Sequence, residues 1–533
     1  MFLPEVPVGP MPRRLLVLLT AVLAAAGLGL VSPARAATTY GNDVSWPQCS
    51  VAEGGYGLPM PPSDAAFVVI GLTKGLPFTQ NPCLASQIAW AQANGVPAQA
   101  YTMAAYPTNS QYRNQGATGP WLASTTAGRF ANVGYAQARY AVDRLAAAGW
   151  RPPVVWVDVE PRPAQPWPTG TDLRTARNRW VVTGLLRGLS DAGYPYGLYS
   201  YANGWSEITG TWRLPGVPVW ATAGRRGSTA AQQMCAGPSF SGGPVHLAQW
   251  YDDTRDYDLT CPAYVFAPTF APWPPSGPND VNADWNPDLL ARERSTGTLW
   301  LYLHQIGSAP GWAPRLQLGT RWQGMSVVDT AGDLTNDGRP DVLAVERATG
   351  RAWIYTFRLG EPAFGPRIDA GTVLAGSDLV AGVGDLSGDG VNDVLARERA
   401  TGSLWLYRRT TTGWGTRVRI GGGWNVMDAV LAPGDVTGDG RPDVLAREKA
   451  TGYLWLYPGT PAGGLGTRSR IGSGWGIFDA LAAPGDLDRD LRPDVIARER
   501  STGYLWQYSR DDAGNWRPRV RIGTGWQVFD VIS

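Results

Sequence analysis

Residues 154–161 read VVWVDVEP, an apolar run that ends in two acids and a proline. Alternate side chains of a β-strand lie on one face, so Asp158 and Glu160 are expected to point the same way. Pro161 lacks the N–H that a further ladder bond needs, which places both acids at the carboxyl end of the strand. Carboxylates are costly to desolvate, so burial alone does not account for them. Two interpretations remain: a helix N-cap with a salt-bridge partner, or the paired acids of a glycosidase.

Other strand-like runs lie on both sides of this stretch. Those before it are Tyr40–Trp46, Ala66–Leu72 and Val96–Met103, and those after it are Tyr196–Tyr201, Val217–Ala223, Val245–Tyr251 and Tyr257–Cys261. The clearest helical patterns cover Gln80–Asn94, Thr126–Gly149 and Asp172–Ala192. Eight strands with helices or long loops between most of them predict an α/β fold of the (β/α)8-barrel type, with parallel strands, over residues 37–266.

The barrel prediction brings four acids together, because the active site of such a barrel lies where its strands end. Asp43 comes near the end of the first strand, Asp158 and Glu160 end the fourth, and Asp258 lies in the eighth. We expect these four acids to be the catalytic groups. Aromatic side chains near strand ends are suited to stacking on sugar rings, or else pack in the barrel core; they are Tyr101, Trp156, Tyr199, Tyr201, Trp220 and Trp250.

The composition and the N-terminus indicate an exported globular protein. The 46 basic and 44 acidic residues give a net charge of +2, which does not suggest a nucleic-acid partner. Residues 1–36 have the pattern of a secretory signal peptide, with Arg13-Arg14 before an apolar run over Leu15–Leu30 and a cleavage site at Ala34–Ala36. We expect a secreted, extracellular or cell-wall-associated protein without a stable membrane anchor; an uncleaved N-terminal anchor is the alternative.

Cysteine and histidine usage narrows the chemistry. An even number of cysteines in an exported chain predicts two disulfides, and of the three pairings we favour Cys49–Cys83 and Cys235–Cys261, each bracketing one short segment. Two histidines, His246 and His304, are too few for a zinc hydrolase and argue against a Ser-His relay. Carboxylates remain as the acid–base groups, and we expect no cofactor in the barrel.

The first domain resembles a known enzyme family along its whole length. The motifs are GNDVSWPQ (41–48), AFVVIGLTKG (66–75), VVWVDVE (154–160), GLYSYANGW (197–205) and QWYDDTRDYDLT (249–260). In this order they resemble glycoside hydrolase family 25, the lysozyme-type muramidases and related domains. The most specific of them is the Asp-x-Glu formed by Asp158 and Glu160.

The resemblance implies roles for the four acids. Glu160 would be the general acid, and Asp158 would stabilise positive charge or orient the substrate's acetamido group. Asp43 and Asp258 would line the same mouth. The implied substrate is the glycan of peptidoglycan, cleaved between N-acetylmuramic acid and N-acetylglucosamine, by a covalent nucleophile or through the substrate's own N-acetyl group.

Two positions that border the expected cleft depart from the family pattern. Lys74 stands where the family usually has an acid, and Tyr101-Thr102-Met103 stands where it usually has Tyr-His-Phe. These departures favour the alternative function, a non-catalytic glycan-binding or adhesion protein with a degenerate hydrolase barrel.

The second half of the chain is repetitive. After a proline-rich linker over residues 267–278, one pattern occurs five times, most clearly in Gly434–Tyr457 (GDVTGDGRPDVLAREKATGYLWLY). The copies begin at Asp280, Asp333, Asp385, Asp435 and Asp486. So regular a period, near 50 residues, indicates a repeat architecture.

Each copy places oxygen-bearing side chains at loop positions 1, 3, 5 and 9. These are Asp280, Asn282, Asp284 and Asp288; Asp333, Thr335, Asp337 and Asp341; Asp385, Ser387, Asp389 and Asp393; Asp435, Thr437, Asp439 and Asp443; and Asp486, Asp488, Asp490 and Asp494. Hard oxygen ligands at alternating positions predict Ca²⁺ loops, the alternative being Asx-rich turns that bind nothing. Trp285 and Leu491 replace glycine at position 6, so the first and fifth sites are expected to be the weakest.

Each repeat also contains about four strand-like runs, which suggests the blade of an all-β propeller over residues 279–533. The pattern resembles FG-GAP (VCBS-type) repeats. The last stretch, Gly525–Ser533, matches the strand that precedes a calcium loop, so we expect it to complete the first blade and close a five-bladed ring. One tryptophan series (Trp300, Trp353, Trp405, Trp455, Trp506) is expected to pack between blades; the other (Trp322, Trp424, Trp475, Trp526) is the expected exposed sugar platform.

The sequence therefore predicts a secreted two-domain protein: a glycosidase barrel acting on cell-wall glycan, and a calcium-binding propeller for attachment to a surface or polysaccharide. A purely structural adhesin would explain the repeats but not the four convergent acids.

Overall fold

The computed structural model describes most of the 533-residue chain. The described residues are 38–214, 216–264, 279–282, 284–305, 311–335, 337, 339–358, 363–410, 413–511 and 513–533. The expected signal peptide and the expected linker lie outside them. No helix among the described residues has the length and apolar character needed to cross a bilayer.

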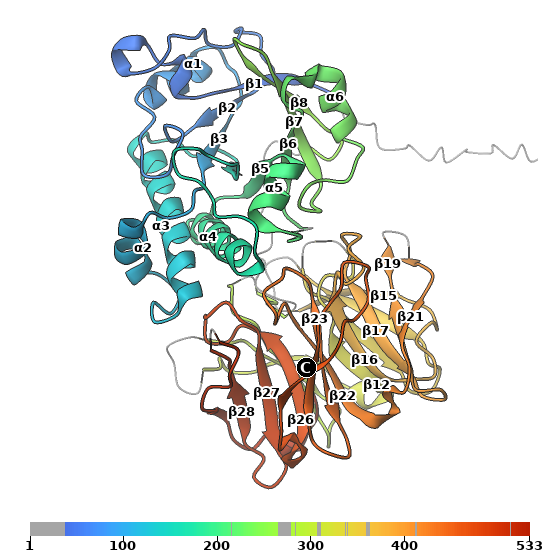
Figure 1. The fold of residues 1–533 in the computed structure, drawn as a ribbon. Coiled ribbons are helices and arrows are strands. Elements are labelled where there is room, and N and C mark those ends of the chain that lie inside the picture. The colour runs from blue at the N-terminus through green and yellow to red at the C-terminus, as the bar shows by residue number, and fades with distance from the viewer. Residues whose placement is uncertain are drawn as a thin grey trace, which may run out of the picture. The chain divides into compact units, whose positions relative to one another are not determined.

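The first domain is a closed barrel of eight strands, as predicted (Figure 1). In barrel order the strands are β1 (Tyr40–Val44), β2 (Val68–Gly71), β3 (Ala98–Met103), β4 (Val155–Asp158), β5 (Tyr196–Ser200), β6 (Val219–Thr222), β7 (Val245–Tyr251) and β8 (Asp256–Thr260). The helices of this domain are α1 (Leu84–Ala93), α2 (Asn109–Asn114), α3 (Thr126–Ala147), α4 (Asp172–Asp191), α5 (Ala202–Thr209) and α6 (Gly227–Met234). Short 3₁₀ turns cover Trp46–Gln48, Val51–Glu53, Gln115–Ala117 and Gly224–Arg226.

The last strand corrects the expectation of a fully parallel barrel. β8 runs antiparallel to both of its neighbours, β7 and β1. Only residues 252–255 connect β7 to β8, and so short a link can make a turn but not a crossover between parallel strands. The Asp252 carboxylate stabilises that turn by accepting hydrogen bonds from the backbone N–H groups of Thr254 and Arg255. The start of β8 therefore lies at the barrel end where β1 to β7 finish.

Helices α3 and α4 pack closely outside the barrel, side by side in Figure 1. A Cβ atom on Gly134 would lie 1.8 Å from the carbonyl oxygen of Val181, and one on Gly184 would lie 1.8 Å from that of Ala131. Each glycine thus allows the backbone of the other helix to approach. The Thr125 and Thr171 side chains cap the two helices at their N-termini.

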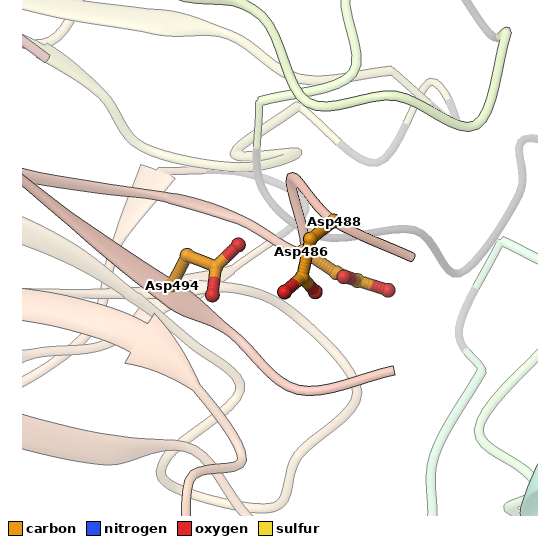
Figure 2. A group of neighbouring side chains, drawn as sticks. All are labelled: Asp486, Asp488 and Asp494. Atoms are coloured by element: carbon orange, nitrogen blue, oxygen red, sulfur yellow. The ribbon is translucent and has the colours of Figure 1, made fainter. Parts of the chain in front are cut away.

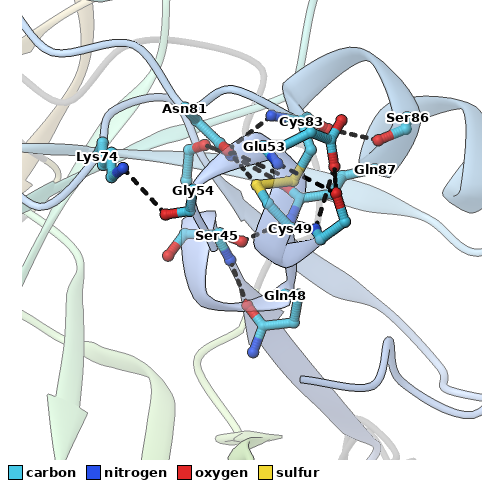
Figure 3. Close-up of a disulfide and its surroundings, with 12 residues drawn as sticks. Ser45, Gln48, Cys49, Glu53, Gly54, Lys74, Asn81, Cys83, Ser86 and Gln87 are labelled. Atoms are coloured by element: carbon cyan, nitrogen blue, oxygen red, sulfur yellow. Dashed lines mark hydrogen bonds between the residues drawn. A yellow bond between two sulfur atoms is a disulfide. The ribbon is translucent and has the colours of Figure 1, made fainter. Parts of the chain in front are cut away.

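Both predicted disulfides are present, Cys49–Cys83 and Cys235–Cys261. Figure 3 shows the first, which joins the segment after β1 to the start of α1. Beside it, the buried Asn81 side chain donates to the Gly71 carbonyl at the end of β2. The Gln87 amide donates to the carbonyl of Ser45, directly after β1. These bonds hold the end of β1, and with it Asp43, in place.

The second domain is a ring of five four-stranded sheets. In sheet order they are β11 (Leu316–Gly319), β10 (Leu299–Tyr302), β9 (Leu289–Glu293) and β30 (Phe529–Ile532); β12 (Met325–Thr330), β13 (Val342–Glu346), β14 (Ala352–Phe357) and β15 (Phe364–Asp369); β16 (Ser377–Gly384), β17 (Asp393–Glu398), β18 (Ser403–Tyr407) and β21 (Val418–Gly421); β22 (Met427–Gly434), β23 (Asp443–Glu448), β24 (Leu454–Tyr457) and β25 (Ser469–Gly472); and β26 (Phe478–Gly485), β27 (Asp494–Glu499), β28 (Leu505–Tyr508) and β29 (Val520–Gly523). A small ribbon of β19 (Arg409–Thr410) and β20 (Gly413–Trp414) is added in the third repeat.

The predicted ring closure is confirmed. The C-terminal strand β30 pairs with β9 and so completes the first blade. The Ser533 hydroxyl donates a 2.8 Å hydrogen bond to the Asp329 carboxylate and accepts a 2.9 Å bond from the Thr330 N–H, both at the end of β12 in the second blade. The end of the chain is thereby bonded to two neighbouring blades.

The expectation of a tryptophan sugar platform is wrong. The residues concerned begin short 3₁₀ turns and are only 4–6% exposed; the turns are Trp322–Gly324, Trp424–Val426, Trp475–Ile477 and Trp526–Val528. Each indole packs against a tyrosine of the blade that its turn leads into, with ring centroids 4.7–4.8 Å apart, as in Trp424 and Tyr457. In the other series the rings are half-buried, with an arginine guanidinium 3.7–4.0 Å from each ring centroid.

Candidate functional site

Asp158 and Glu160 occupy the predicted position at the end of β4. Asp158 is the last residue of the strand and is 3% exposed, whereas Glu160 lies beyond it and is half-buried. One guanidinium nitrogen, Nη2 of Arg162, donates to both acids: the distance is 2.7 Å to Asp158 Oδ2 and 2.9 Å to Glu160 Oε2. The other Asp158 oxygen, Oδ1, is buried without a hydrogen-bond partner. The two acids therefore share a single cation.

The segment after Glu160 is built to turn the chain back. Pro161 and Pro163 flank Arg162, and proline fixes its own φ and restricts the residue before it. The indole N–H of Trp167 donates a 3.0 Å hydrogen bond to the Glu160 carbonyl oxygen. Backbone restriction and this bond hold the segment in the conformation that directs the Arg162 side chain over the acids.

Asp43 faces the same interior from β1. Its Oδ2 accepts a 2.7 Å hydrogen bond from Gln249 Nε2 on β7, and the Gln249 oxygen accepts a 2.7 Å bond from the Tyr199 hydroxyl on β5. All three side chains are buried. The carboxylate of Asp43 is thus oriented by a side chain that is itself fixed from another strand.

Two acids come from β8 because that strand runs antiparallel. Asp258 is completely buried, and its Oδ1 accepts a 2.7 Å hydrogen bond from the indole N–H of Trp220. Asp256 begins the strand and is paired in register with Asp43. Alternation along the strand puts Asp256 and Asp258 on one face, so Asp256 lies nearer the open end of the barrel.

Burial raises the pKa of every one of these acids, and repulsion from a neighbouring acid adds to this for all of them except Asp158. Desolvation is the largest cause throughout, and the pKa of both Asp43 and Asp258 lies well above its ordinary value. For Glu160, desolvation and then the negative charge of Asp158 raise the pKa to about 8, against the opposing effect of Arg162. Desolvation also raises the pKa of Asp158, against the opposing charge and hydrogen bond of Arg162. The pKa of Asp256 is raised to about 6 by burial and by Asp252.

The expected sugar-binding aromatic residues divide into three groups. Trp156 and Trp220 are each 1% exposed and form the floor of the interior below the acids, so they offer no surface to a ligand. Trp250 follows the inward-facing Gln249 and packs against Tyr257 and Tyr40 on the opposite face of the strand. The remaining three (Tyr101, Tyr199, Tyr201) lie close enough to the acids for Asp158 or Glu160 to raise the pKa of each, in addition to the larger effect of burial.

The structure places the residues that depart from the family pattern differently: of the segment Tyr101-Thr102-Met103, only Thr102 points away from the acids. Tyr101 lies near Asp43 and Asp158, and the Met103 sulfur lies 3.7 Å from Arg162 Nη2, so both point inward. Thr102 between them points to the outer face of β3 and is buried there. Lys74 Nζ donates to the Gly54 carbonyl and lies 5.3 Å from the Trp46 ring centroid. The ion pairs between described residues do not include Lys74.

The five propeller loops have one common hydrogen-bond pattern. The aspartate at position 1 accepts from the backbone N–H of position 5, as Asp435 does from Asp439. The aspartate at position 9 accepts from a backbone N–H near the loop start, as Asp443 does from Thr437. In three of the loops the other oxygen of the position-9 aspartate is buried without a hydrogen-bond partner; these residues are Asp341, Asp393 and Asp494. Such orphaned carboxylate oxygens are suited to a hard cation.

The fifth loop has the closest grouping of acids. Among the described residues, Asp486, Asp488 and Asp494 form a set whose ligand atoms all lie within 4.8 Å of one another. Figure 2 shows these three side chains. Leu491 at position 6 has a φ of +63°, and Trp285 has +67°, in the region that Gly390 and Gly440 occupy in their loops. The loop shape is therefore kept without glycine, in a strained conformation. Arg517 lies 3.2 Å from Asp488 and 3.0 Å from Asp490.

Sequence reasoning missed three residues of the barrel site: Arg162, Gln249 and Asp256. Asp256 had a detectable signal, because it alternates with Asp258 as Asp158 alternates with Glu160. The signal for Gln249 was weaker: it is a polar residue near the end of the seventh predicted strand, where the active site of such a barrel is expected. Arg162 had none beyond its flanking prolines, because its contact depends on the path of a loop.

Comparisons with known proteins give matches for both domains. No curated protein sequence matches this chain. Among solved structures, it is similar to the family GH25 lysozyme from Aspergillus fumigatus at 17% identity and a TM-score of 0.27, over 42% of this chain and 94% of that one. It is also similar to the bacterial lysozyme from Streptomyces coelicolor (17%, 0.28, 42% and 92%) and to the modular autolysin LytC from Streptococcus pneumoniae (13%, 0.25, 42% and 46%).

The family match lies in the propeller. Residues 280–344, 333–396, 385–446 and 435–497 each match the FG-GAP-like repeat. These spans start at the aspartates that open the first four loops. The C-terminal part of the chain is therefore composed of FG-GAP repeats.

Proposed function

We propose that this protein is a secreted glycoside hydrolase that cleaves peptidoglycan or a related N-acetylhexosamine glycan. The observation that carries the proposal is the pair Asp158 and Glu160: two adjacent carboxyl groups in one barrel mouth, in unequal environments. Glycosidic cleavage needs a protonated carboxyl beside an ionised one, and such a pair provides both. The family resemblance of the surrounding motifs supplies the substrate class.

The unequal environments indicate which acid is the proton donor and which is the ionised carboxylate. Glu160 is the more exposed of the two, and its raised pKa of about 8 keeps it protonated at neutral pH. It would donate that proton to the glycosidic oxygen as the bond breaks. Asp158 is the more buried and lies against Arg162, which favours its ionised form. It would stabilise the positive charge that develops on the sugar or orient an acetamido group of the substrate.

The distance between the two acids favours retention of anomeric configuration. Both carboxylate oxygens bond to the same nitrogen, and the two bonds of 2.7 Å and 2.9 Å limit the separation of the oxygens to 5.6 Å. Inverting glycosidases hold their carboxyl groups about 6.5–9.5 Å apart to leave room for a water molecule, and retaining ones hold them about 5–5.5 Å apart. Retention also results when the substrate's acetamido group takes the place of the protein nucleophile.

For the propeller we propose Ca²⁺ binding in the repeated loops. The support is the donor set, with carboxylates at positions 1, 5 and 9 of every loop, and the buried carboxylate oxygens without hydrogen-bond partners at position 9. A bound cation would neutralise acids whose pKa burial now raises, among them Asp393 and Asp443, both to about 7. A propeller stabilised in this way would attach the enzyme to a surface or polysaccharide outside the cell.

One observation favours an alternative without catalysis. The Arg162 guanidinium lies on both acids, and a barrel that only binds glycan could retain such a neutralised pair. Turnover distinguishes the two functions. An enzyme releases reducing ends continuously from insoluble peptidoglycan, whereas a binding protein remains on the sediment and releases none.

A further inference from the structure

The guanidinium of Arg162 touches both acids of the barrel mouth, whereas the proposed reaction uses it only as the cation beside Asp158. It contacts both acids through a single nitrogen, and its side chain is 30% exposed while that of Asp158 is 4% exposed. We propose that Arg162 is a positioning residue that gives the two acids their different roles: it holds Asp158 as the ionised carboxylate and leaves Glu160 as the proton donor. This inference rests on the proposed glycosidase function.

The geometry gives the guanidinium unequal effects on its two partners. Asp158 is almost fully buried, and Arg162 is the only cation that bonds to it among the described residues. Glu160 is more exposed and has the longer of the two bonds, 2.9 Å against 2.7 Å. Burial alone opposes ionisation of both acids, but the attraction between opposite charges is stronger where water is more fully excluded, and for Asp158 the contact with Arg162 is the main effect that opposes desolvation. For Glu160 the charge of Asp158 adds to desolvation and outweighs Arg162, so the first of the two acids to ionise should be Asp158. Its negative charge then opposes ionisation of Glu160.

Within the described part of the chain, the neighbouring elements add no competing cation. The other groups that face the pair are Asp43 on β1, Tyr101 on β3, Tyr199 on β5 with Tyr201 after it, and Asp256 and Asp258 on β8. None of these groups carries a positive charge, and the acids among them oppose ionisation of the pair when they are themselves ionised. Arg162 is therefore the group that stabilises one ionised carboxylate in this mouth.

The position of the guanidinium is set before substrate arrives. Pro161 and Pro163 restrict the backbone on both sides, and Trp167 holds the Glu160 carbonyl. Arginine also remains charged across the working pH range, and it offers more than one donor in a fixed plane. A lysine at this position would supply the charge without N–H groups fixed in one plane, so Arg162→Lys should retain part of the effect that Arg162→Gln loses.

The test follows the carboxyl groups themselves, in the full mature chain labelled with ¹³C at the side-chain carboxyls of Asp and Glu. The signals of the pair are assigned by their loss in Asp158→Asn and Glu160→Gln, and pH titrations then compare the wild type, Arg162→Gln, Arg162→Lys and the matched control Arg151→Gln. Arg151 is an exposed arginine before β4 that donates a 2.8 Å hydrogen bond to the Gly193 carbonyl and none to the acids. We expect Asp158 to ionise first in the wild type. Arg162→Gln should move both titrations to higher pH by about one pH unit or more, Arg162→Lys by less, and Arg151→Gln not at all.

The same variants give a kinetic readout on peptidoglycan. Both limbs of the pH profile of kcat/KM should move to higher pH in Arg162→Gln and partly return in Arg162→Lys, whereas a merely structural loss would lower the profile without moving it. Titrations that stay in place, or Glu160 ionising before Asp158, would overturn the inference. If Arg162→Gln is more active at every pH and the limbs of its pH profile do not move, the guanidinium blocks access of substrate to the acids instead, and the inference is wrong. If the wild type shows no turnover, the proposed function fails, and the carboxyl titrations still decide the role of Arg162.

Discussion

Gln249 on β7 donates a 2.7 Å hydrogen bond from Nε2 to Oδ2 of Asp43 on β1, past the intervening strand β8. The same side chain accepts a 2.7 Å bond from the Tyr199 hydroxyl. One neutral amide therefore satisfies an acid and a phenol inside the barrel, and it fixes Asp43 relative to the floor of the site.

Replacing Gln249 with leucine should impair both stability and turnover. The change leaves a buried carboxyl and a buried hydroxyl without partners, which costs about 1–3 kcal/mol for each group. We expect the free energy of unfolding to fall and kcat/KM to fall about tenfold or more, because Asp43 loses its orientation. Gln99→Leu is the matched control: Gln99 is fully buried and accepts a bond from Trp156, deeper in the barrel. If the two variants lose stability equally and also lose turnover equally, the orientation of Asp43 by Gln249 does not contribute to catalysis.

The stereochemistry of cleavage should be retention. The limit of 5.6 Å between the two acid oxygens that share the bond to Arg162 is shorter than the separation of about 6.5–9.5 Å at which inverting glycosidases hold their carboxyl groups around substrate and water. Proton NMR during the first minutes of hydrolysis of a soluble chitooligosaccharide or peptidoglycan fragment will show which anomer forms first. Initial formation of the β-anomer from a β-linked substrate is the predicted result, and initial formation of the α-anomer would contradict it.

The stability of the barrel should depend on the proton of Glu160. Its pKa in the folded chain, about 8, lies above the ordinary value of 4.5, so the folded state binds more protons than the unfolded state between these values. Stability from this group is therefore greatest below about pH 4.5 and is lost as the pH rises toward 8. The loss is at most about 1.4 kcal/mol for each pH unit in that interval. Asp43 and Asp258 act in the same direction.

Glu160→Gln should consequently unfold at a temperature that falls less steeply with pH than that of the wild type. Thermal unfolding recorded from pH 5 to pH 8.5 measures this. Glu207→Gln changes an exposed acid of α5 in the same way and should leave the slope unchanged. Identical slopes for wild type and Glu160→Gln would mean that Glu160 is ionised in the folded protein at neutral pH.

Removal of divalent cations should destabilise the propeller. A ligand that binds only the folded state adds about 2.7 kcal/mol at a concentration of 100 times its Kd, so a chelator should lower the unfolding temperature by several degrees. Asp494→Asn removes a position-9 carboxylate, and its unfolding should respond less to Ca²⁺. The control Asp369→Asn alters an exposed acid outside the loops. If neither chelator nor Ca²⁺ changes the unfolding temperature, the loops are turns that bind no metal and the proposal is wrong.

Much of this architecture was predictable because its signals are local. Strand runs, the alternation of Asp158 and Glu160, the repeat spacing and the cysteine pairs each lie within a short stretch of sequence. The direction of β8 was not predicted, although the four residues between β7 and β8 limit the link to a turn. That reversal is what brings Asp256 to the open end of the barrel beside Asp43.

Contacts that depend on tertiary packing escaped sequence reasoning. Trp424 follows a glycine-rich turn, a local pattern equally typical of an exposed platform, and only the neighbouring blade with Tyr457 makes it buried. Trp156 lies on the same face of the strand as Asp158 and Glu160, so the sequence could not tell a ligand-binding residue from a core residue. Only its depth in the barrel shows that it belongs to the core. Arg162 is two residues from Glu160 in sequence, but the path of the chain through Pro161 and Pro163 decides what it touches.

The release of reducing ends from purified peptidoglycan by the mature chain, wild type beside Glu160→Gln, tests the central claim most directly. The two proteins should have the same fold by circular dichroism and should sediment with peptidoglycan to the same extent. We predict continuous release by the wild type and a loss of about a hundredfold or more in the variant, because the proton donor is gone. Equal release by both proteins, or none by a folded wild type that still sediments with the glycan, would contradict the claim that Glu160 makes this barrel a glycosidase.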